Sequence, residues 1–244
     1  MKTNILGCSI DKVTMDQAIE IVESYINTGK HHHIITLNAE ILYNAQSDEK
    51  LKAIIQQADL VTADGAGIVW ASNHLGDPVP QRVTGIDLME ALVKVAAEKG
   101  WKLYFFGAAP GVAELAAENL QKKHKNLKIV GTKDGYRSSK QMPELLADIK
   151  EKKPDILFVA LGAPRQEFWI KEHKELLQVP VAIGVGGSFD VLAGKVKRAP
   201  KIFQQLHAEW LYRLLKEPWR YKRMMALPKF ILKIMQEKRN HLRS

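Results

Sequence analysis

The fold is decided by the stretch Leu60-Val61-Thr62-Ala63-Asp64-Gly65-Ala66-Gly67-Ile68-Val69-Trp70. An apolar run ends at Asp64, two glycines follow, and a second apolar run begins with helical spacing. This order is typical of a buried strand, a tight turn and the start of a helix. In open α/β sheets the carboxyl ends of the strands face the ligand crevice, so we expect Asp64 where ligands bind. An alternative stays open, because Asp is a favoured N-cap and Asp64 could simply cap the following helix.

Strand and helix patterns alternate along the rest of the chain. After a strand or hairpin arm over residues 3–10, strands are predicted at 31–37, 60–64, 101–106, 127–131, 155–161 and 180–184. The capping-box pattern Thr14-x-x-Gln17 opens one of the intervening helices, and the loop 73–84 follows another. At least four strands end in a turn with Gly or Asn. We therefore predict an α/β fold: a doubly wound, mostly parallel, Rossmann-like sheet with helices on both faces and a ligand site at its carboxyl edge.

Composition narrows the class of protein. The chain has 244 residues, 46% of them hydrophobic, which suits one α/β domain with a small appendage. Its one cysteine, Cys8, excludes an internal disulfide and fits a reducing, cytoplasmic location. The first residues lack the apolar stretch of a signal peptide, and no run approaches the ~18 apolar residues that span a bilayer. We expect a protein that is not integral to a membrane.

Charge divides the chain into two parts. Residues 1–194 hold 22 Lys and Arg against 24 Asp and Glu, whereas residues 195–244 hold 14 against 3, within a net charge of +9. We predict a catalytic α/β domain over 1–194 and a basic helical appendage over 195–244. Such an asymmetry indicates an anionic partner for the appendage: nucleic acid, anionic lipid or a phosphorylated substrate.

The appendage also mixes aromatic residues with its cations. Its helical runs begin at Pro200 and Pro228, and Pro218 interrupts the first of them. The interleaved residues are Trp210, Tyr212, Arg213, Trp219, Arg220, Tyr221 and Arg223. This mixture favours a membrane interface, where each Lys or Arg near an anionic leaflet contributes about 1 kcal/mol. Two alternatives remain: a helix that packs on the sheet and shows its charges to water, and a grip on nucleic acid.

The predicted sheet edge offers what a transferase of nucleotide-linked sugars needs. The glycine turns provide a nucleotide pocket, and Asp64, with Thr36 and Asn38 on a neighbouring strand end, provides a base. Arg82 and the arginines of the appendage provide positive charge for a leaving diphosphate. The sequence contains no Asp-x-Asp pair, so we expect no metal requirement and no cofactor. The consecutive histidines His31–His33 alternate between strand faces and are not expected to hold one ion.

Motifs spread over nearly the whole chain resemble one known family. They are Thr36-Leu37-Asn38, Thr62-Ala63-Asp64-Gly65-Ala66-Gly67, Phe106-Gly107-Ala108, Asp134-Gly135-Tyr136, Ala160-Leu161-Gly162-Ala163-Pro164-Arg165-Gln166-Glu167, Gly184-Val185-Gly186-Gly187-Ser188-Phe189-Asp190, Gly194, Lys197-Arg198-Ala199-Pro200, Glu209-Trp210-Leu211-Tyr212-Arg213 and Pro218-Trp219-Arg220-Tyr221-Lys222-Arg223. In this order they are similar to the WecG/TagA/CpsF family of bacterial glycosyltransferases.

This resemblance implies a cytoplasmic, inverting glycosyltransferase that associates peripherally with the inner face of the plasma membrane. Its donor would be a UDP-linked N-acetylhexosaminyl or hexosaminuronic sugar, and its acceptor polyprenyl-diphosphate-linked N-acetylglucosamine. In the TagA branch the donor is UDP-N-acetylmannosamine, and the product is the linkage unit of wall teichoic acid. The donor's C6 group has no marker in the sequence, so the corresponding uronic acid or another UDP-hexose stays open.

The resemblance also assigns residues. Asp64 would be the general base, with Thr36, Asn38, Arg82 and Gln166 around the reacting sugars. The residues expected around the UDP are Gly107, Tyr136, Gly162, Gly186 and Asp190, and those expected at the acceptor diphosphate are Arg213, Arg220 and Arg223. Nucleic acid is not an expected partner, although a nucleotide sensor that binds nucleic acid remains an alternative of another class. A dehydrogenase is disfavoured, because the strict glycine fingerprint is missing.

Overall fold

Six parallel strands form the central sheet of the protein, in the order β4-β3-β8-β7-β5-β6. The computed structural model describes residues 1–136, 138–200, 203, 209–216, 221 and 225–241. The strands are β3 (His32–Leu37), β4 (Leu60–Ala63), β5 (Lys102–Gly107), β6 (Lys128–Lys133), β7 (Ile156–Ala160) and β8 (Val181–Gly184). The predicted doubly wound α/β sheet is therefore confirmed, with strand ends displaced by one or two residues.

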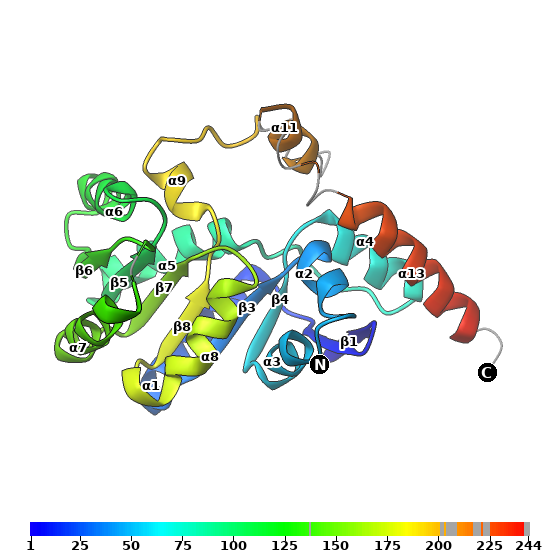
Figure 1. The fold of residues 1–244 in the computed structure, drawn as a ribbon, viewed down its shortest axis with the longest axis horizontal. Coiled ribbons are helices and arrows are strands. Elements are labelled where there is room, and N and C mark those ends of the chain that lie inside the picture. The colour runs from blue at the N-terminus through cyan, green and yellow to red at the C-terminus, as the bar shows by residue number, and fades with distance from the viewer. Residues whose placement is uncertain (137, 201–202, 204–208, 217–220, 222–224, 242–244) are drawn as a thin grey trace.

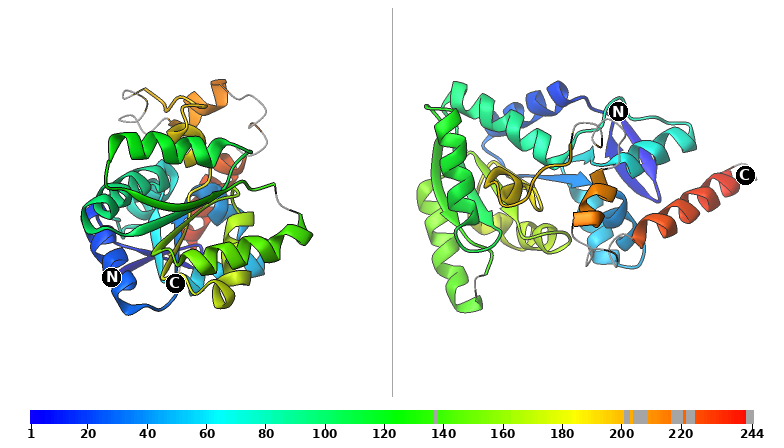
Figure 2. Two further views of the ribbon diagram at one scale, coloured as in Figure 1. Left: turned by 90° about the vertical axis from the view of Figure 1, so that its left-hand side faces the viewer. Right: turned by 90° about the horizontal axis from the view of Figure 1, so that it is seen from above.

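Helices cover both faces of this sheet (Figures 1 and 2). One apolar cluster joins the sheet to α1 (Met15–Thr28), α5 (Gly85–Lys99), α6 (Val112–Lys123) and α9 (Ser188–Leu192). Two clusters on the other face involve α2 (Ala39–Asn44), α3 (Glu49–Gln57), α4 (Ala66–Leu75), α7 (Met142–Lys152) and α8 (Arg165–Leu177). The 3-10 helix η1 (Ser139–Gln141) precedes α7, and an antiparallel hairpin of β1 (Lys2–Ile5) and β2 (Cys8–Asp11) joins the cluster around α2 and α4.

The strands are apolar on both sides because both sides are covered. In β5, Leu103 and Phe105 belong to the cluster with α1 and α5, whereas Tyr104 and Phe106 belong to the cluster with α7 and α8. Every residue of β7 and β8 is buried. Near-continuous apolar strands of this kind are typical of parallel sheets between two helical layers.

Several helix ends follow the predicted signals. The capping box of Thr14 is present, and Gly29 ends α1 in the left-handed conformation. Helix α4 differs from one expectation, because Gly65 occupies its N-cap and no side chain caps it. The interpretation of Asp64 as a simple cap of the following helix is therefore wrong. Helix α4 also continues to Leu75, so the loop predicted from residue 73 begins at Gly76.

The last helix, α13 (Ala226–His241), is packed onto the body of the protein beside α4 (Figure 1). It begins two residues before Pro228, where the sequence suggested its start, because the first turn of a helix tolerates proline. Phe230 and Ile234 are buried in the cluster with α2 and α4. The carboxylate of Glu237 accepts the backbone N–H of Leu6 at 3.0 Å. The basic appendage over residues 195–244, called the basic segment below, thus includes a helix that is part of the core.

The short helix α11 (Glu209–Lys216) precedes α13 and, like α9, lies above the sheet in the view of Figure 1. The domain boundary predicted at residue 194 stays a prediction. Within the part of the chain that the structure describes, no helix is both long and apolar enough to cross a membrane.

Candidate active site

The turns singled out in the sequence lie on one edge of the sheet. Because all six strands are parallel, their carboxyl ends share the edge from which α9 follows β8 (Figure 1). Asn38 follows β3, Asp64 follows β4, and Gly162 and Gly186 lie just beyond β7 and β8. The prediction of a shared rim of polar residues and glycine turns is confirmed.

Asp64 is held at this edge from two sides. Its backbone N–H donates to the carbonyl of Leu37 at 2.8 Å, which fixes it beside the end of β3. Its Oδ2 accepts the N–H of Gly85, the first residue of α5, at 3.2 Å. The side chain is half-buried. The carboxylate is therefore oriented by a helix that begins 21 residues later in the chain.

Asn38 and Arg82 lie beside Asp64. Asn38 caps α2, with its Oδ1 accepting the N–H of Ile41 at 2.9 Å, and a Cβ placed on Gly65 would lie 4.0 Å from the Cβ of Asn38. Arg82 is half-buried and precedes Val83, whose N–H donates to the carbonyl of Ala63 at 3.0 Å. The segment with Arg82 thus runs along the end of β4, next to Asp64.

Thr36 connects this group to the middle of the sheet. It is buried, and its Oγ1 donates to the carbonyl of Gly184 at the end of β8, 3.1 Å away. A Cβ on Gly85 would lie 3.0 Å from the same oxygen, so the start of α5 packs directly on Thr36. The structure therefore places Thr36, Asn38, Asp64 and the segment that carries Arg82 close to one another, and their roles at the reacting sugars stay a prediction.

Gln166 supports the turn after β8 from the other side. Its side chain is only 3% exposed, its Oε1 accepts the N–H of Gly186 at 3.0 Å, and its Nε2 donates to Oε1 of Glu167 at 2.9 Å. A Cβ on Gly184 would lie 2.5 Å from Nε2 of Gln166, so the amide packs closely against this turn. These contacts are internal, and the role of Gln166 beside the reacting sugars stays a prediction.

The residues predicted around the UDP line the other half of the edge. Gly107 has a φ of 126°, and a Cβ there would lie 2.4 Å from the carbonyl oxygen of Ala160, so only glycine allows β5 and β7 to end side by side. Tyr136 is 76% exposed beyond β6, and its N–H donates to Oδ1 of Asp134 at 2.9 Å. Asp190 lies half-buried in the first turn of α9.

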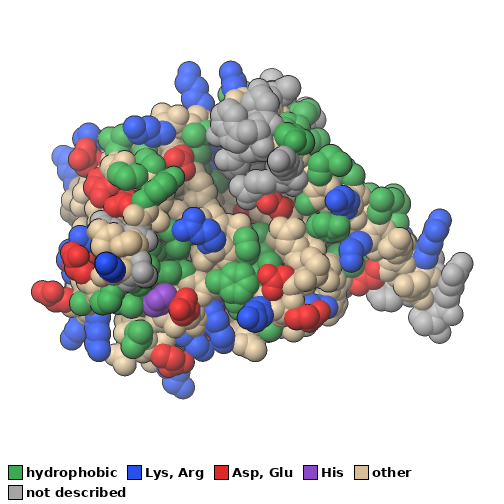
Figure 3. Space-filling view, viewed as in Figure 1, with side chains coloured by type: hydrophobic (Ala, Val, Ile, Leu, Met, Phe, Trp, Pro, Cys, Tyr) green, Lys and Arg blue, Asp and Glu red, His purple; other side chains and the backbone are tan. Residues whose placement is uncertain are grey.

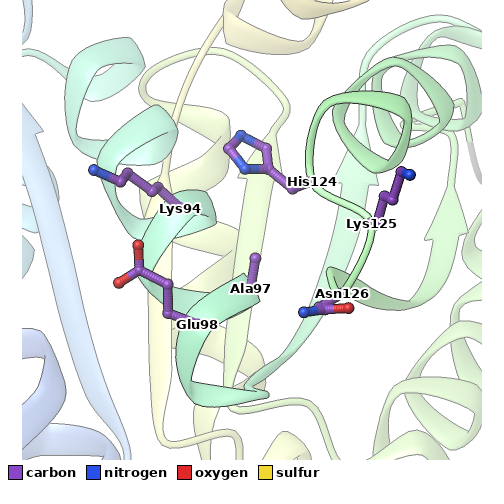
Figure 4. A pocket seen from close by; sticks show the side chains of 6 residues that line it. All are labelled: Lys94, Ala97, Glu98, His124, Lys125 and Asn126. Atoms are coloured by element: carbon purple, nitrogen blue, oxygen red, sulfur yellow. The ribbon is translucent and has the colours of Figure 1, made fainter.

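A surface cavity of about 300 Å³ lies away from this edge, between the second half of α5 and the turn before β6 (Figure 4). Both segments lead into the amino ends of strands, so the cavity belongs to the opposite edge of the sheet. It is lined by Lys94, Ala97, Glu98, His124, Lys125 and Asn126. We place the candidate site at the carboxyl edge instead, because the carboxylate, the amides and the glycine turns converge there.

The histidines of β3 and the arginines of the basic segment have different outcomes. His31, His32 and His33 lie at the amino end of β3, and among the described residues no group of three potential ligands is placed to hold a metal ion. Arg213 falls in α11, but its side chain lies outside the described part, as do Arg220 and Arg223 entirely.

Two charged residues at this edge lie in the quoted motifs but received no role of their own from sequence reasoning. Arg198 lies in the predicted Lys197-Arg198-Ala199-Pro200 motif and pairs with Asp87 at 2.5 Å and with Glu90 at 3.5 Å, which ties the start of the basic segment to α5. Glu167 is 1% exposed, and burial raises the pKa of its carboxyl above the ordinary value. The only sequence signal for Glu167 was its place beside Gln166 just after a strand end.

Comparisons with known proteins identify the family of the chain. The model of the glycosyl transferase WecG/TagA/CpsF family matches residues 3–244. A relative from Bacillus spizizenii is 38% identical over 216 residues, covering 88% of this chain and 83% of its own length. A relative from Staphylococcus aureus strain MW2 is 37% identical over 240 residues, covering 98% of this chain and 94% of its own. Both are named N-acetylglucosaminyldiphosphoundecaprenol N-acetyl-beta-D-mannosaminyltransferase.

Proposed function

The chain belongs to the WecG/TagA/CpsF family of glycosyl transferases, and we propose that it transfers N-acetylmannosamine from UDP-N-acetylmannosamine to polyprenyl-diphosphate-linked N-acetylglucosamine. The product would be the linkage unit of wall teichoic acid. Both relatives carry the name of this transfer. The observation that carries the proposal is Asp64, whose carboxylate is held by the N–H of Gly85 at the shared carboxyl edge, beside Thr36 and Asn38.

The proposed reaction is a direct displacement with inversion at the anomeric carbon. A hydroxyl oxygen of the acceptor sugar forms a bond to that carbon while the bond from the carbon to the UDP oxygen breaks. The bonding electron pair leaves with UDP, and the hydroxyl proton passes to Asp64. A carboxylate is a sufficient base, because the proton becomes acidic only as the new bond forms.

The neighbouring residues would stabilise the charge that this step creates. Arg82 lies next to the end of β4 and has the planar fork that suits a diphosphate. Arg213, Arg220 and Arg223 of the basic segment would meet the diphosphates of donor and acceptor. On the other half of the edge, the backbone around Gly107, Gly162 and Gly186, with Tyr136 and Asp190, would hold the UDP.

We also propose that the transfer needs no metal ion. Support comes from the sequence, which has no Asp-x-Asp pair, and from the arginines that can offset the charge of the leaving diphosphate. If a divalent ion takes part, chelation with excess EDTA will abolish UDP release and added Mg²⁺ or Mn²⁺ will restore it. We expect the same rate with EDTA as without it.

The acceptor is lipid-linked, and we propose that the outer face of α13 rests on the anionic inner face of the plasma membrane. Phe230 and Ile234 face the core, whereas Ile231, Leu232 and Met235 are exposed, with Leu232 60% exposed. The same helix carries Lys229, Lys233, Lys238 and Arg239. Figure 3 shows hydrophobic and basic side chains together at the end of the molecule that α13 forms in Figure 1. Exposed apolar side chains flanked by cations suit an anionic bilayer surface.

Vesicle sedimentation tests this surface. We expect the protein to sediment with vesicles that contain phosphatidylglycerol, less at high salt, and not with pure phosphatidylcholine. Leu232→Glu should weaken this binding, whereas Leu176→Glu is a matched control, because Leu176 is comparably exposed but lies on α8. A protein that ignores anionic vesicles and shifts DNA or RNA in a gel would favour the nucleic-acid alternative instead.

A donor screen tests the transfer itself. The purified protein is incubated with a short-chain polyprenyl-diphosphate N-acetylglucosamine and single UDP-sugars, and UDP release and the disaccharide product are measured. We expect UDP-N-acetylmannosamine to be used far better than the others. Preference for its uronic acid or for another UDP-hexose would replace the proposed donor, and no release with any UDP-sugar would contradict the proposal.

A further inference from the structure

Glu167 is a buried acid that the proposed reaction does not use. It lies in the first turn of α8, directly after the turn that follows β7, and only 1% of the residue is exposed. Its Oε1 accepts a hydrogen bond from Nε2 of Gln166 at 2.9 Å, while its Oε2 is buried without a hydrogen-bond partner in the described structure. Besides Gln166, the backbone N–H of Glu167 itself lowers the pKa of this carboxyl. A buried carboxylate with so few donors is unfavourable, so this group needs an explanation.

The explanation lies in the amide that Glu167 contacts. A glutamine amide has a donating end and an accepting end, and its orientation is set by its partners. Glu167 takes the donating end of Gln166, which leaves the accepting oxygen for the N–H of Gly186, 3.0 Å away. The reverse orientation would place the amide oxygen against an acceptor and an N–H against an N–H.

The turn held in this way, Gly184–Gly186 at the end of β8, lies in the middle of the carboxyl edge. Thr36 donates to the carbonyl of Gly184 from one side, and Gln166 accepts from Gly186 on the other. Gly186 itself has a φ of 53°, and the space where its Cβ would lie is open. A ligand can therefore approach the backbone of this turn closely, provided that the turn stays in place.

We propose that Glu167 is a positioning residue, which orients the amide of Gln166 and through it fixes the Gly184–Gly186 turn against the donor nucleotide. The proposal rests on the proposed transferase function only for its effect on activity. The part played by Glu167 is that of a hydrogen-bond acceptor, not of a charge or a base. Burial raises the pKa of this carboxyl, which fits a neutral acid in this place.

Two substitutions of Glu167 distinguish the role of a hydrogen-bond acceptor from that of a base. Glu167→Gln keeps an acceptor oxygen and the shape of a neutral acid, so we expect kcat and KM within about twofold of the wild type and an unchanged pH profile. Glu167→Met keeps the length of the side chain but accepts poorly, so we expect the KM for the UDP-sugar to rise about tenfold, with a smaller effect on kcat. Glu172→Met, on the exposed side of the same helix, is the matched control and should change neither.

A readout that needs no substrate accompanies the kinetics. In ¹H–¹⁵N spectra, Glu167→Met should shift the Gly186 amide and the Gln166 side-chain amide and raise hydrogen exchange at Gly186, and Glu167→Gln should leave Gly186 close to the wild type. If Glu167→Met does not fold, Glu167→Asp, which withdraws the carboxyl by one methylene, takes its place with the same expectations.

Loss of turnover in Glu167→Gln to the level of an Asp64 variant would overturn the proposal, because Glu167 would then act through its charge. An unchanged Gly186 amide and an unchanged KM in folded Glu167→Met would overturn it as well. If the wild type uses no UDP-sugar, the proposed function fails, and the Gly186 amide still decides on the positioning role.

Discussion

Acid should destabilise this protein through one buried histidine, His33 in β3. The residue is buried, and its Nε2 has no hydrogen-bond partner in the described structure. The pKa of His33 is lowered from 6.5 to about 3, mainly by burial and to a smaller extent by the nearby His31, Lys171 and Lys174, against an opposing effect of Asp59. The folded protein therefore resists a proton that the unfolded chain accepts.

The sign and size of the effect follow from these two pKa values. Above pH 6.5 the imidazole is neutral in both states and contributes nothing. As the pH falls below 6.5 the unfolded chain binds a proton that the folded protein excludes, so stability falls until the pH reaches about 3. Between pH 7.5 and pH 5.0 the loss from His33 is about 2 kcal/mol, and any folded pKa below about 4 gives the same figure.

Urea unfolding at pH 7.5 and pH 5.0, followed by tryptophan fluorescence, measures this loss. The comparison is His33→Leu, which has a similar volume and no titration, so that His31 and all carboxyl groups remain in both proteins. We expect the wild type to lose about 2 kcal/mol more than the variant over this interval. An equal pH dependence of the free energy of unfolding in the two proteins would refute the reasoning.

Three further results are expected. Phe230→Ala should lower the free energy of unfolding by about 3–4 kcal/mol, because Phe230 is buried against α2 and α4. Leu232→Ala, on the exposed side of the same helix, should change it by less than about 0.5 kcal/mol. Equal effects of the two substitutions in urea unfolding would mean that α13 is not part of the core. Gly107→Ala should prevent normal folding or abolish UDP binding measured by calorimetry, because its Cβ would meet a backbone carbonyl at 2.4 Å; Gly111→Ala, also at positive φ but with open space around it, should only lower stability by about 1 kcal/mol, and a Gly107→Ala protein that binds UDP normally would contradict the close approach. Binding to anionic vesicles should weaken much more steeply between low and high salt than UDP-sugar turnover on a short-chain acceptor does, and an equal salt dependence of both would argue against a separate membrane surface on α13.

The fold was predictable because the sequence marks most of its strands clearly. Short apolar runs between glycine turns and amphipathic helices leave few alternatives to a doubly wound parallel sheet. The largest shift concerns β6, which ends at Lys133 rather than at residue 131. As an edge strand it is only partly buried along its length, so apolar periodicity does not mark its end.

The place of Asp64 was predictable, but its surroundings were not. A strand that ends in Asp-Gly puts the carboxylate at the ligand edge whatever the rest of the chain does. Its bond to Gly85 and the bond from Thr36 to Gly184 join residues 21 and 148 positions apart, and only the packed sheet brings them together. The burial of Glu167 beside Gln166 is likewise a property of the tertiary structure.

The basic segment shows a different limit. Its charge and aromatic residues suggest a partner that binds at its surface. The same stretch nevertheless contains two buried core residues, Phe230 and Ile234, spaced four residues apart on one face of α13. Helical spacing of this kind identifies a buried face only once a neighbouring surface is known. Here that surface is provided by α2, which Asn38 caps, and by α4, which begins two residues after Asp64, so the packed helix adjoins the elements that form the site.

The most direct test of the account is the turnover of Asp64→Asn with UDP-N-acetylmannosamine and a short-chain polyprenyl-diphosphate N-acetylglucosamine. The amide can still accept from the N–H of Gly85, so the variant should fold and bind UDP like the wild type. We predict that product formation falls by about 10²–10⁴-fold, because no base takes the acceptor proton. Product formation within a few fold of the wild type by the folded variant would contradict the assignment of Asp64 as the base.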